Sequence, residues 1–324
     1  MKLLIAYDGS RCAEAALDDL KRAGLPDSGD GIVISVAEVW LPPAGEKDDI
    51  DTTDPYIRKM VMRYREKGER ALDETRDFAG HAEKRLRDIL PQWTFRTVAT
   101  YGSPAWEILS AADDELPDLI VVGSQGQSAV SRLLLGSISQ KVLTEARCSV
   151  RVARGRIDVD PSPVRIVIGF DSSRGAAAAV DAVAARNWPD GTEVKLISVA
   201  DPAKPTVIGR LVPPIAGAVD EVNATEREWL EDNAGNAMDK LKSAGVNASL
   251  EIIAGNPKKA IVESAEAWHA DSIFVGANAF GSRLERFLIG STSSAVAARA
   301  HCSVEVIRFS GDASLADAEG RKDS

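Results

Sequence analysis

The feature that most constrains the fold of this chain is an internal repeat across nearly all of its 324 residues. The segment KLLIAYDGS at 2–10 returns as RIVIGFDSS at 165–173, an offset of 163 residues. At the same offset, ISVA at 34–37 recurs unchanged at 197–200. Self-similarity of this kind indicates two copies of one domain, not two different domains.

The later parts of the two copies match at a shorter offset. YGSP at 101–104 pairs with AGNP at 254–257, and RCSVRVAR at 147–154 pairs with HCSVEVIR at 301–308. The second copy has therefore lost about ten residues in its middle. The last residues, GDASLADAEGRKDS, have no aromatic residue and no β-branched run, which is typical of disorder. We expect a first domain at 1–154, a linker at 155–163, a second domain at 164–310 and a disordered tail at 311–324.

Each copy alternates short apolar runs rich in Val and Ile with longer stretches of helical composition. This pattern is typical of α/β proteins, in which parallel strands are buried on both faces by crossover helices. In the first copy we expect strands near 2–7, 31–37, 94–100, 118–122 and 148–153, and helices near 10–23, 53–88, 104–114 and 137–146. In the second copy we expect strands near 164–170, 193–199, 248–253, 271–275 and 303–308.

Composition narrows the classes of function. The formal net charge of -10 disfavours nucleic acid and anionic membranes as partners, because affinity for polyanions comes from clustered Lys and Arg. The N-terminus shows no signal-peptide pattern, and no run of 18 apolar residues occurs, so we expect a cytoplasmic protein. The three cysteines are sparse and lack CxxC spacing, which argues against a disulfide framework and a zinc site.

A glycine pattern stands out in the segment GSQGQSAVSRLLLGSIS at 123–139. Gly123 ends the apolar run LIVVG, so it lies where a buried parallel strand leaves the sheet at its carboxyl edge. Ligands of open α/β sheets bind at that edge. A glycine there permits a positive φ and lets a ligand approach amides that a Cβ would shield. Gly126 follows three residues later and would line the same corner.

Gly136 and Ser137 form a second corner before the helical stretch SISQKVLTEAR. Ser137 and Gln140 have capping-box spacing, which predicts free backbone N–H groups at a helix N-terminus. The two corners together could hold a polyphosphate without a lysine. The alternative is that the glycines only shape a loop and precede a capped helix. There is no Walker A motif, and no G-x-G-x-x-G follows the first strand of either copy.

The combination of these motifs resembles the universal stress protein family in its tandem two-domain form. The motifs are an Asp after the first strand, ISVA, YGSP, the spacing G-x2-G-x9-G-S and a CSV-type last strand, and they cover 1–154 and 164–308. The resemblance implies two doubly wound domains, each a parallel sheet of order 3-2-1-4-5, packed as an intramolecular pseudo-dimer about a pseudo-twofold axis through their last strands. In the ATP-binding branch it implies ATP, or ADP or AMP, at the carboxyl edge. Magnesium would be an optional companion, because no carboxylate cluster marks a strong magnesium site.

The family's nucleotide-binding positions carry over residue by residue. Asp8 has a structural alternative, as a cap of the helix that opens at Ser10, and Arg132 is either a phosphate partner or a solvated arginine. In the first copy the resemblance implies Ala6 and Asp8 beside the adenosine, Val36 against adenine, Val122, Gly123, Gln125 and Gly126 at the first phosphate corner, and Gly136, Ser137, Ile138 and Ser139 at the second.

The second copy departs from the pattern at one corner, where Ala279 or Phe280 takes the position of Gly126 and the next glycine is Gly281. We therefore expect tighter nucleotide binding in the first copy. The second copy keeps Asp171, Val199, Val275, Gly276, Gly290, Ser291, Thr292 and Ser293.

Three functions follow as hypotheses. The first is a nucleotide-binding protein of stress response or signalling, in which ATP switches a conformation and turnover is slow or absent. The second is a slow ATPase or adenylyl-handling enzyme, although neither copy shows a catalytic base next to an activated nucleophile. The third is a nucleotide-free module that binds another protein. The protein partner, and whether whole chains form a homodimer, are left open by the sequence.

Overall fold

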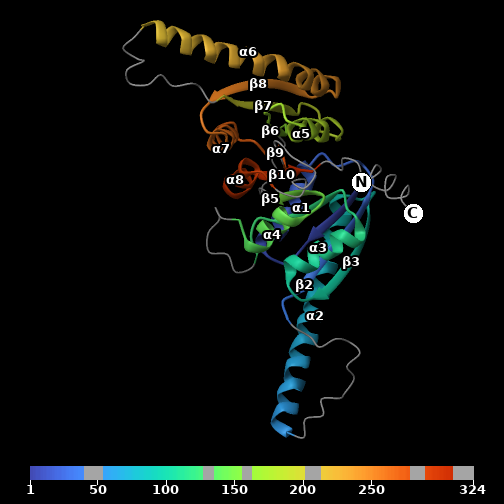
Figure 1. The fold of residues 1–324 in the computed structure, drawn as a ribbon. Helices are drawn as coiled ribbons and strands as arrows, with labels where there is room; N and C mark the ends of the chain where they lie inside the picture. Colours follow the sequence, from blue (N-terminus) through green and yellow to red (C-terminus); the bar gives the residue numbers. More distant parts are fainter. Residues whose placement is uncertain (40–53, 127–134, 155–162, 201–212, 278–288, 309–324) are drawn as a thin grey trace, which may run out of the picture.

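The computed structural model describes residues 1–39, 54–126, 135–154, 163–200, 213–277 and 289–308. Its centre is one ten-stranded sheet of order β3-β2-β1-β4-β5-β10-β9-β6-β7-β8 (Figure 1). The first half contributes β1 (Lys2–Ala6), β2 (Asp30–Ala37), β3 (Thr94–Tyr101), β4 (Leu119–Gly123) and β5 (Ser149–Ala153). The second contributes β6 (Arg165–Gly169), β7 (Glu193–Ala200), β8 (Asn247–Ala254), β9 (Ser272–Gly276) and β10 (Ser303–Ile307).

Each half has the predicted parallel order, and the two halves join through their last strands. β5 and β10 pair antiparallel, with Arg151 directly opposite Glu305. This confirms the expected α/β class and the packing of the copies about a pseudo-twofold axis. Because the edges of β5 and β10 cover each other, the two domain sheets become one continuous mixed sheet.

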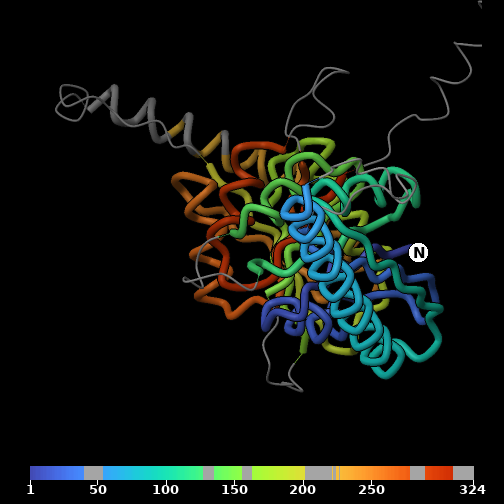
Figure 2. The backbone as a smooth tube through the Cα atoms, turned by 90° about the horizontal axis from the view of Figure 1, so that it is seen from below, coloured from blue at the N-terminus to red at the C-terminus, as the bar shows by residue number. Residues whose placement is uncertain are grey.

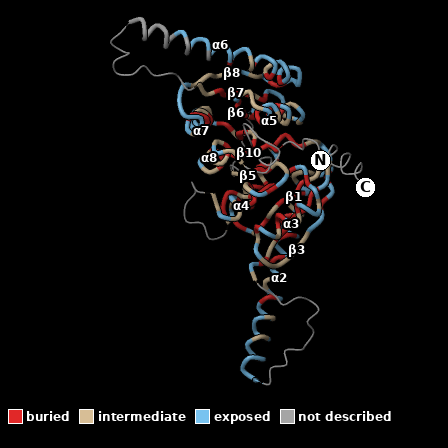
Figure 3. Tube along the Cα trace, in the orientation of Figure 1, coloured by how far each residue is buried: buried red, intermediate tan, exposed pale blue. Residues whose placement is uncertain are grey.

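Helices cover both faces of the sheet, as Figures 1 and 3 show. Helices α3, α4, α7 and α8 pack on one face, over a single apolar core that runs through both halves. On the other face, α1 and α2 cover one core and α5 and α6 cover another. The helices are α1 (Arg11–Asp19, followed by a 3₁₀ turn at Leu20–Arg22), α2 (Pro55–Ile89), α3 (Pro104–Glu115), α4 (Ser137–Glu145), α5 (Arg174–Ala184), α6 (Pro213–Ser243), α7 (Pro257–Ala267) and α8 (Ser291–Arg299).

Local sequence explains where these helices begin. Ser10 caps α1 by accepting a hydrogen bond from the Ala13 N–H, and Ser173 caps α5 in the same way. Helices α2, α3 and α7 each have a proline in the first turn, where a missing N–H leaves no hydrogen bond unmade.

Helix α2 is longer than the sheet it covers. Its first turns are mostly exposed up to Lys67, and Gly68 is its first fully buried residue. Figure 1 shows this end projecting below the body, and Figure 2, from below, shows the rest of α2 lying across the first half. The packed part of α2 reaches the carboxyl edge of the sheet, which brings its side chains to the cavity at that edge.

The predicted linker at 155–163 lies outside the described residues except for Pro163, and the predicted tail at 311–324 lies wholly outside them. The domain boundaries stay a prediction.

Candidate functional site

A cavity of about 460 Å³ opens at the carboxyl ends of β1, β2 and β4. It lies where the strand order reverses between β1 and β4, the usual ligand position in doubly wound sheets. Strand ends supply most of the wall, and the first turn of α4 closes one side. The structure brings together Ala6, Asp8, Val36, Val122, Gly123, Gln125, Gly126, Ile138 and Ser139 in this wall.

Gly136 and Ser137 lie next to the cavity and not in its wall. The Gly136 N–H donates to the carbonyl of Ser124 at 2.8 Å, which ties the start of α4 to the end of β4. Gly136 itself is the N-cap residue, so the predicted capping box headed by Ser137 is wrong. The Ser137 side chain is exposed at the first helical position.

Close packing explains Gly123 and Gly126, and none of the three glycines has a positive φ. Gly136 has a φ of −66°, within the range of any residue. A Cβ at Gly123 would lie 3.1 Å from the backbone carbonyl of Cys12, because β4 passes close to the start of α1. A Cβ at Gly126 would lie 3.1 Å from Asp8 Oδ2. The expectation of positive φ is therefore wrong, and the expectation of close approach fits.

Asp8 does not cap α1, because Ser10 is the N-cap residue, but one of its two carboxylate oxygens shapes the turn before that helix. Its Oδ1 accepts a hydrogen bond from the Ser10 N–H at 3.0 Å, which shapes the turn into α1. Its Oδ2 lies on the side of Gly126, inside the cavity wall. The carboxylate is thus oriented by the backbone and directed at the first glycine corner.

One face of α2 completes the cavity, and sequence reasoning missed it. The α2 residues in the wall are three or four positions apart, so they share one face of the helix. Placing the helix that follows the second strand over the carboxyl edge of the sheet would have predicted them. Phe78 covers Gly9, and the Thr75 hydroxyl donates to the Ala71 carbonyl at 2.7 Å. The α2 residues in the wall are Ala71, Glu74, Thr75 and Phe78; Tyr7, Glu38, Val39 and Ile108 were missed with them.

The charge of the wall limits the chemistry of this cavity. Asp8, Glu38 and Glu74 are acidic, and among the described wall residues there is no Lys or Arg. Burial raises the pKa of Tyr7 above its ordinary value, so this phenol stays neutral, and it bonds to Glu14. The described wall therefore offers carboxylate acceptors and apolar side chains, with no cationic side chain for an anionic group. Arg132 lies outside the described residues.

The second half has an equivalent but smaller cavity of about 210 Å³. Asp171 Oδ1 accepts from the Ser173 N–H at 3.1 Å, as Asp8 does from Ser10. Ser293 Oγ donates to the Gly276 carbonyl at 2.5 Å, which matches the bond from Ser139 to Gly123 at 2.6 Å. The loop with Ala279, Phe280 and Gly281 lies outside the described residues. All eight predicted residues line the cavity, namely Asp171, Val199, Val275, Gly276, Gly290, Ser291, Thr292 and Ser293.

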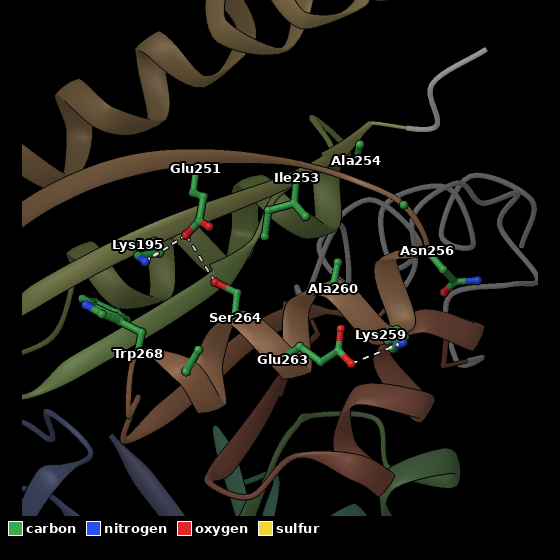
Figure 4. A pocket seen from close by; sticks show the side chains of 12 residues that line it. Lys195, Glu251, Ile253, Ala254, Asn256, Lys259, Ala260, Glu263, Ser264 and Trp268 are labelled. Atoms are coloured by element: carbon green, nitrogen blue, oxygen red, sulfur yellow. Dashed lines mark hydrogen bonds and ion pairs between the residues drawn. The ribbon is translucent and has the colours of Figure 1, made fainter. Parts of the chain in front are cut away.

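A larger cavity of about 580 Å³ lies between α7 and strands β7 and β8 (Figure 4). Its lysines already have carboxylate partners. Lys195 lies 2.8 Å from Glu251, and Lys259 lies 3.4 Å from Glu263. None of the predicted site residues lines this cavity.

The described residues show neither a metal-binding cluster nor a membrane-spanning helix. They contain no group of three or more His, Cys, Asp or Glu side chains placed to hold a metal ion. No helix within them has the length and hydropathy needed to cross a membrane.

Comparison with known proteins agrees with this architecture. The model of the universal stress protein family matches residues 1–154 and 164–308. A universal stress protein of Mycolicibacterium smegmatis is 26% identical over 94% of this chain and 96% of its own length. A Thermus aquaticus universal stress protein is 34% identical over 47% of this chain and 97% of its own length. The crystal structure of a universal stress protein from Archaeoglobus fulgidus has the same fold, with a TM-score of 0.56 and 20% identity over 96% of this chain and 97% of that one. The chain therefore belongs to the universal stress protein family and carries two of its domains in tandem.

Proposed function

We propose that the cavity of the first half binds an adenine nucleotide, and that the protein acts by binding and not by rapid catalysis. The observation that carries this proposal is the convergence of an apolar slot, an oriented carboxylate and a glycine corner in one cavity of about 460 Å³. That volume is in the range of small-molecule sites. Nucleotide binding is also typical of the family.

The wall offers a place for each part of a nucleotide. Val36, Val122 and Ile108 provide an apolar slot for the base. Asp8 can accept hydrogen bonds from ribose hydroxyls, because the Ser10 N–H holds it in place. The phosphates would lie at Gly126 and the start of α4, where amides and the helix dipole favour negative charge. Because the wall is acidic, a triphosphate would suit this cavity better together with magnesium, which would offset the negative charge of the phosphates.

The direct test is to extract purified protein with acid and identify any released nucleotide. A second test is thermal melting with ATP, ADP and AMP in turn. A ligand that binds only the native state, at about 100 times its dissociation constant, adds about 2.7 kcal/mol to the free energy of unfolding. Unchanged melting with all three would favour the protein-binding module, and single-turnover hydrolysis above buffer background would favour the slow enzyme.

Two glycine-to-alanine variants, one at Gly126 and one at Gly80, serve as test and matched control. Gly126→Ala puts a methyl group 3.1 Å from Asp8 Oδ2, so we expect it to reduce the ATP-dependent shift. Gly80 lies on the exposed side of α2, and a Cβ added there would meet no atom of a neighbouring element within 4 Å, so Gly80→Ala should leave the shift unchanged. Equal shifts in both variants would contradict the placement of the ligand at Gly126.

We also propose that the first half binds more tightly, because Gly126 leaves its backbone amide unshielded, whereas the second half has Ala279 or Phe280 at the equivalent position. Asp8→Asn keeps an oxygen for the Ser10 N–H but removes the charge. In titration calorimetry we expect Asp8→Asn to weaken the tight site and Asp171→Asn to spare it. The reverse result would move the tight site to the second half.

A further inference from the structure

The helix that begins at each nucleotide cavity ends on an arginine from the opposite half. The first turn of α4 lines the first cavity through Ile138 and Ser139. At the other end of α4, Arg308 of the second half donates from Nη2 to the carbonyl of Leu143 at 2.7 Å. It also reaches the carbonyl of Thr144 at 3.4 Å. The last carbonyls of a helix have no partner within the helix, so Arg308 acts as a cap supplied by the other domain.

The same contact exists in the opposite direction. The first turn of α8 lines the second cavity. Near its end, the carbonyl of Ala297 accepts a hydrogen bond from Arg154 Nη2 at 2.7 Å. Arg154 and Arg308 are equivalent in the repeat, since each follows the last strand of its half, and Ala297 is equivalent to Leu143. Figure 1 shows α4 and α8 on the same face, on either side of the junction between β5 and β10.

Arg308 is buried and Arg154 is half-buried. Arg308 is 8% exposed, and neither arginine has a carboxylate within ion-pair distance among the described residues. Burial lowers the pKa of both guanidinium groups below the ordinary value. Their favourable electrostatic partner is the negative end of the helix dipole. Each guanidinium group is largely removed from water and bonds mainly to helix carbonyls, so it contributes to the packing of the interface.

We propose that each arginine is a positioning residue for the nucleotide site of the opposite half: Arg308 holds α4 for the first cavity, and Arg154 holds α8 for the second. This proposal rests on the proposed function and adds the regulation of its sites. Helix α4 has nine residues and is about 13 Å long, so its two ends move as one short rod. Freeing its C-terminal end loosens the N-terminal turn that faces the ligand, and nucleotide binding must then order that turn.

The first experiment needs no nucleotide. In hydrogen–deuterium exchange of the full chain, Arg308→Ala should speed exchange in α4 and leave α8 close to wild type. Arg154→Ala should do the reverse. Arg308→Lys, which keeps a charge and a donor, should give an intermediate rate in α4, and it serves as the test if the alanine variant does not fold.

The second experiment uses ATP, with protection of the α4 segment as the local measure of binding in the first half. We expect Arg308→Ala to weaken that binding about tenfold, equivalent to 1.4 kcal/mol, while Arg154→Ala leaves it unchanged. Equal weakening of both halves by either variant, or an effect confined to the arginine's own half, would overturn the crossed arrangement. If wild-type protein binds no nucleotide, the proposed function fails, and the exchange rates of the first experiment still decide whether the arginines position the helices.

Discussion

Gly9 and Ser172 occupy the same position of the repeat and share one backbone conformation. Gly9 has a φ of 74° and Ser172 a φ of 60°, both in the left-handed region that favours glycine. Each residue lies between the site aspartate and the serine that caps the next helix. The Ser172 hydroxyl is also buried with no hydrogen-bond partner among the described residues. The turn is therefore relaxed in the first half and strained in the second.

From this difference we expect opposite effects of exchanging the two residues. Ser172→Gly should raise the free energy of unfolding by about 1 kcal/mol, because a left-handed conformation costs a residue with a Cβ about that much. Gly9→Ser should lower it by more, since a Cβ there would also lie 3.0 Å from the Phe78 ring. Urea unfolding measures both. Ser172→Ala removes the buried hydroxyl and keeps the strain, so it should not give the full gain of glycine.

At the scale of elements, Glu115 ties the end of α3 to two strands. Its carboxylate lies 2.8 Å from Lys2 Nζ on β1, and it also pairs with Arg96 on β3. Hydrogen bonds from Arg96 and Lys2 lower the pKa of Glu115 to about 2. The last turn of α3 is thereby held over the sheet edge near β3.

This lowered pKa gives a pH-dependent contribution with a definite sign. A carboxyl group whose folded pKa is lowered stabilises the fold above its unfolded pKa of 4.5, and this contribution is lost as the pH falls towards about 2. We expect Glu115→Gln to destabilise the protein at pH 7 and to differ little from wild type near pH 2. Denaturant unfolding across this range checks it. Glu263→Gln, which removes an exposed pair with Lys259, should change stability by less than about 1 kcal/mol at pH 7.

At the scale of the whole molecule, a buried ionic cluster joins the halves where β5 meets β10. Arg151 is fully buried and donates to Asp19 at 2.6 Å and to Glu305 at 3.1 Å. Arg186 pairs with the other oxygen of Glu305. Arg151 and Glu305 are equivalent in the repeat and lie directly opposite each other. If two copies of the same half paired in this way, Arg would lie opposite Arg, or Glu opposite Glu. The interface therefore favours pairing of the first half with the second.

We expect the loss of one charge from this cluster to lower the free energy of unfolding more than the replacement of an oppositely charged pair by apolar residues. Glu305→Gln leaves two buried arginines short of a charge and should lower the free energy of unfolding by about 3–5 kcal/mol. The double variant Arg186→Met with Glu305→Leu removes a charge of each sign, so it should be less destabilised than Glu305→Gln. Comparing the two by urea unfolding tests the cluster. A double variant that is the less stable of the two would contradict the view that unpaired charge dominates.

The repeat, the strand positions and the glycine corners could all be predicted from the sequence. Each comes from local information: apolar runs of strand length, a glycine after a strand and a serine before a helix. The resemblance to the family added the strand order and nine of the residues in the wall of the first cavity. Gly136 shows the limit of local reasoning, because its spacing predicted a capping box headed by Ser137, whereas Gly136 itself caps the helix.

Tertiary structure alone decided which distant residues meet. Thr75 and Phe78 reach the cavity because α2 packs along the sheet to its carboxyl edge. Arg308 meets Leu143 across 165 residues of chain, because pairing of β5 with β10 brings one half's last strand to the other half's helix. Sequence by itself determined the two domains and the elements within them, since these depend on periodicity and turn residues. The partners of buried charges depend on how the halves pack, and no local pattern encodes that.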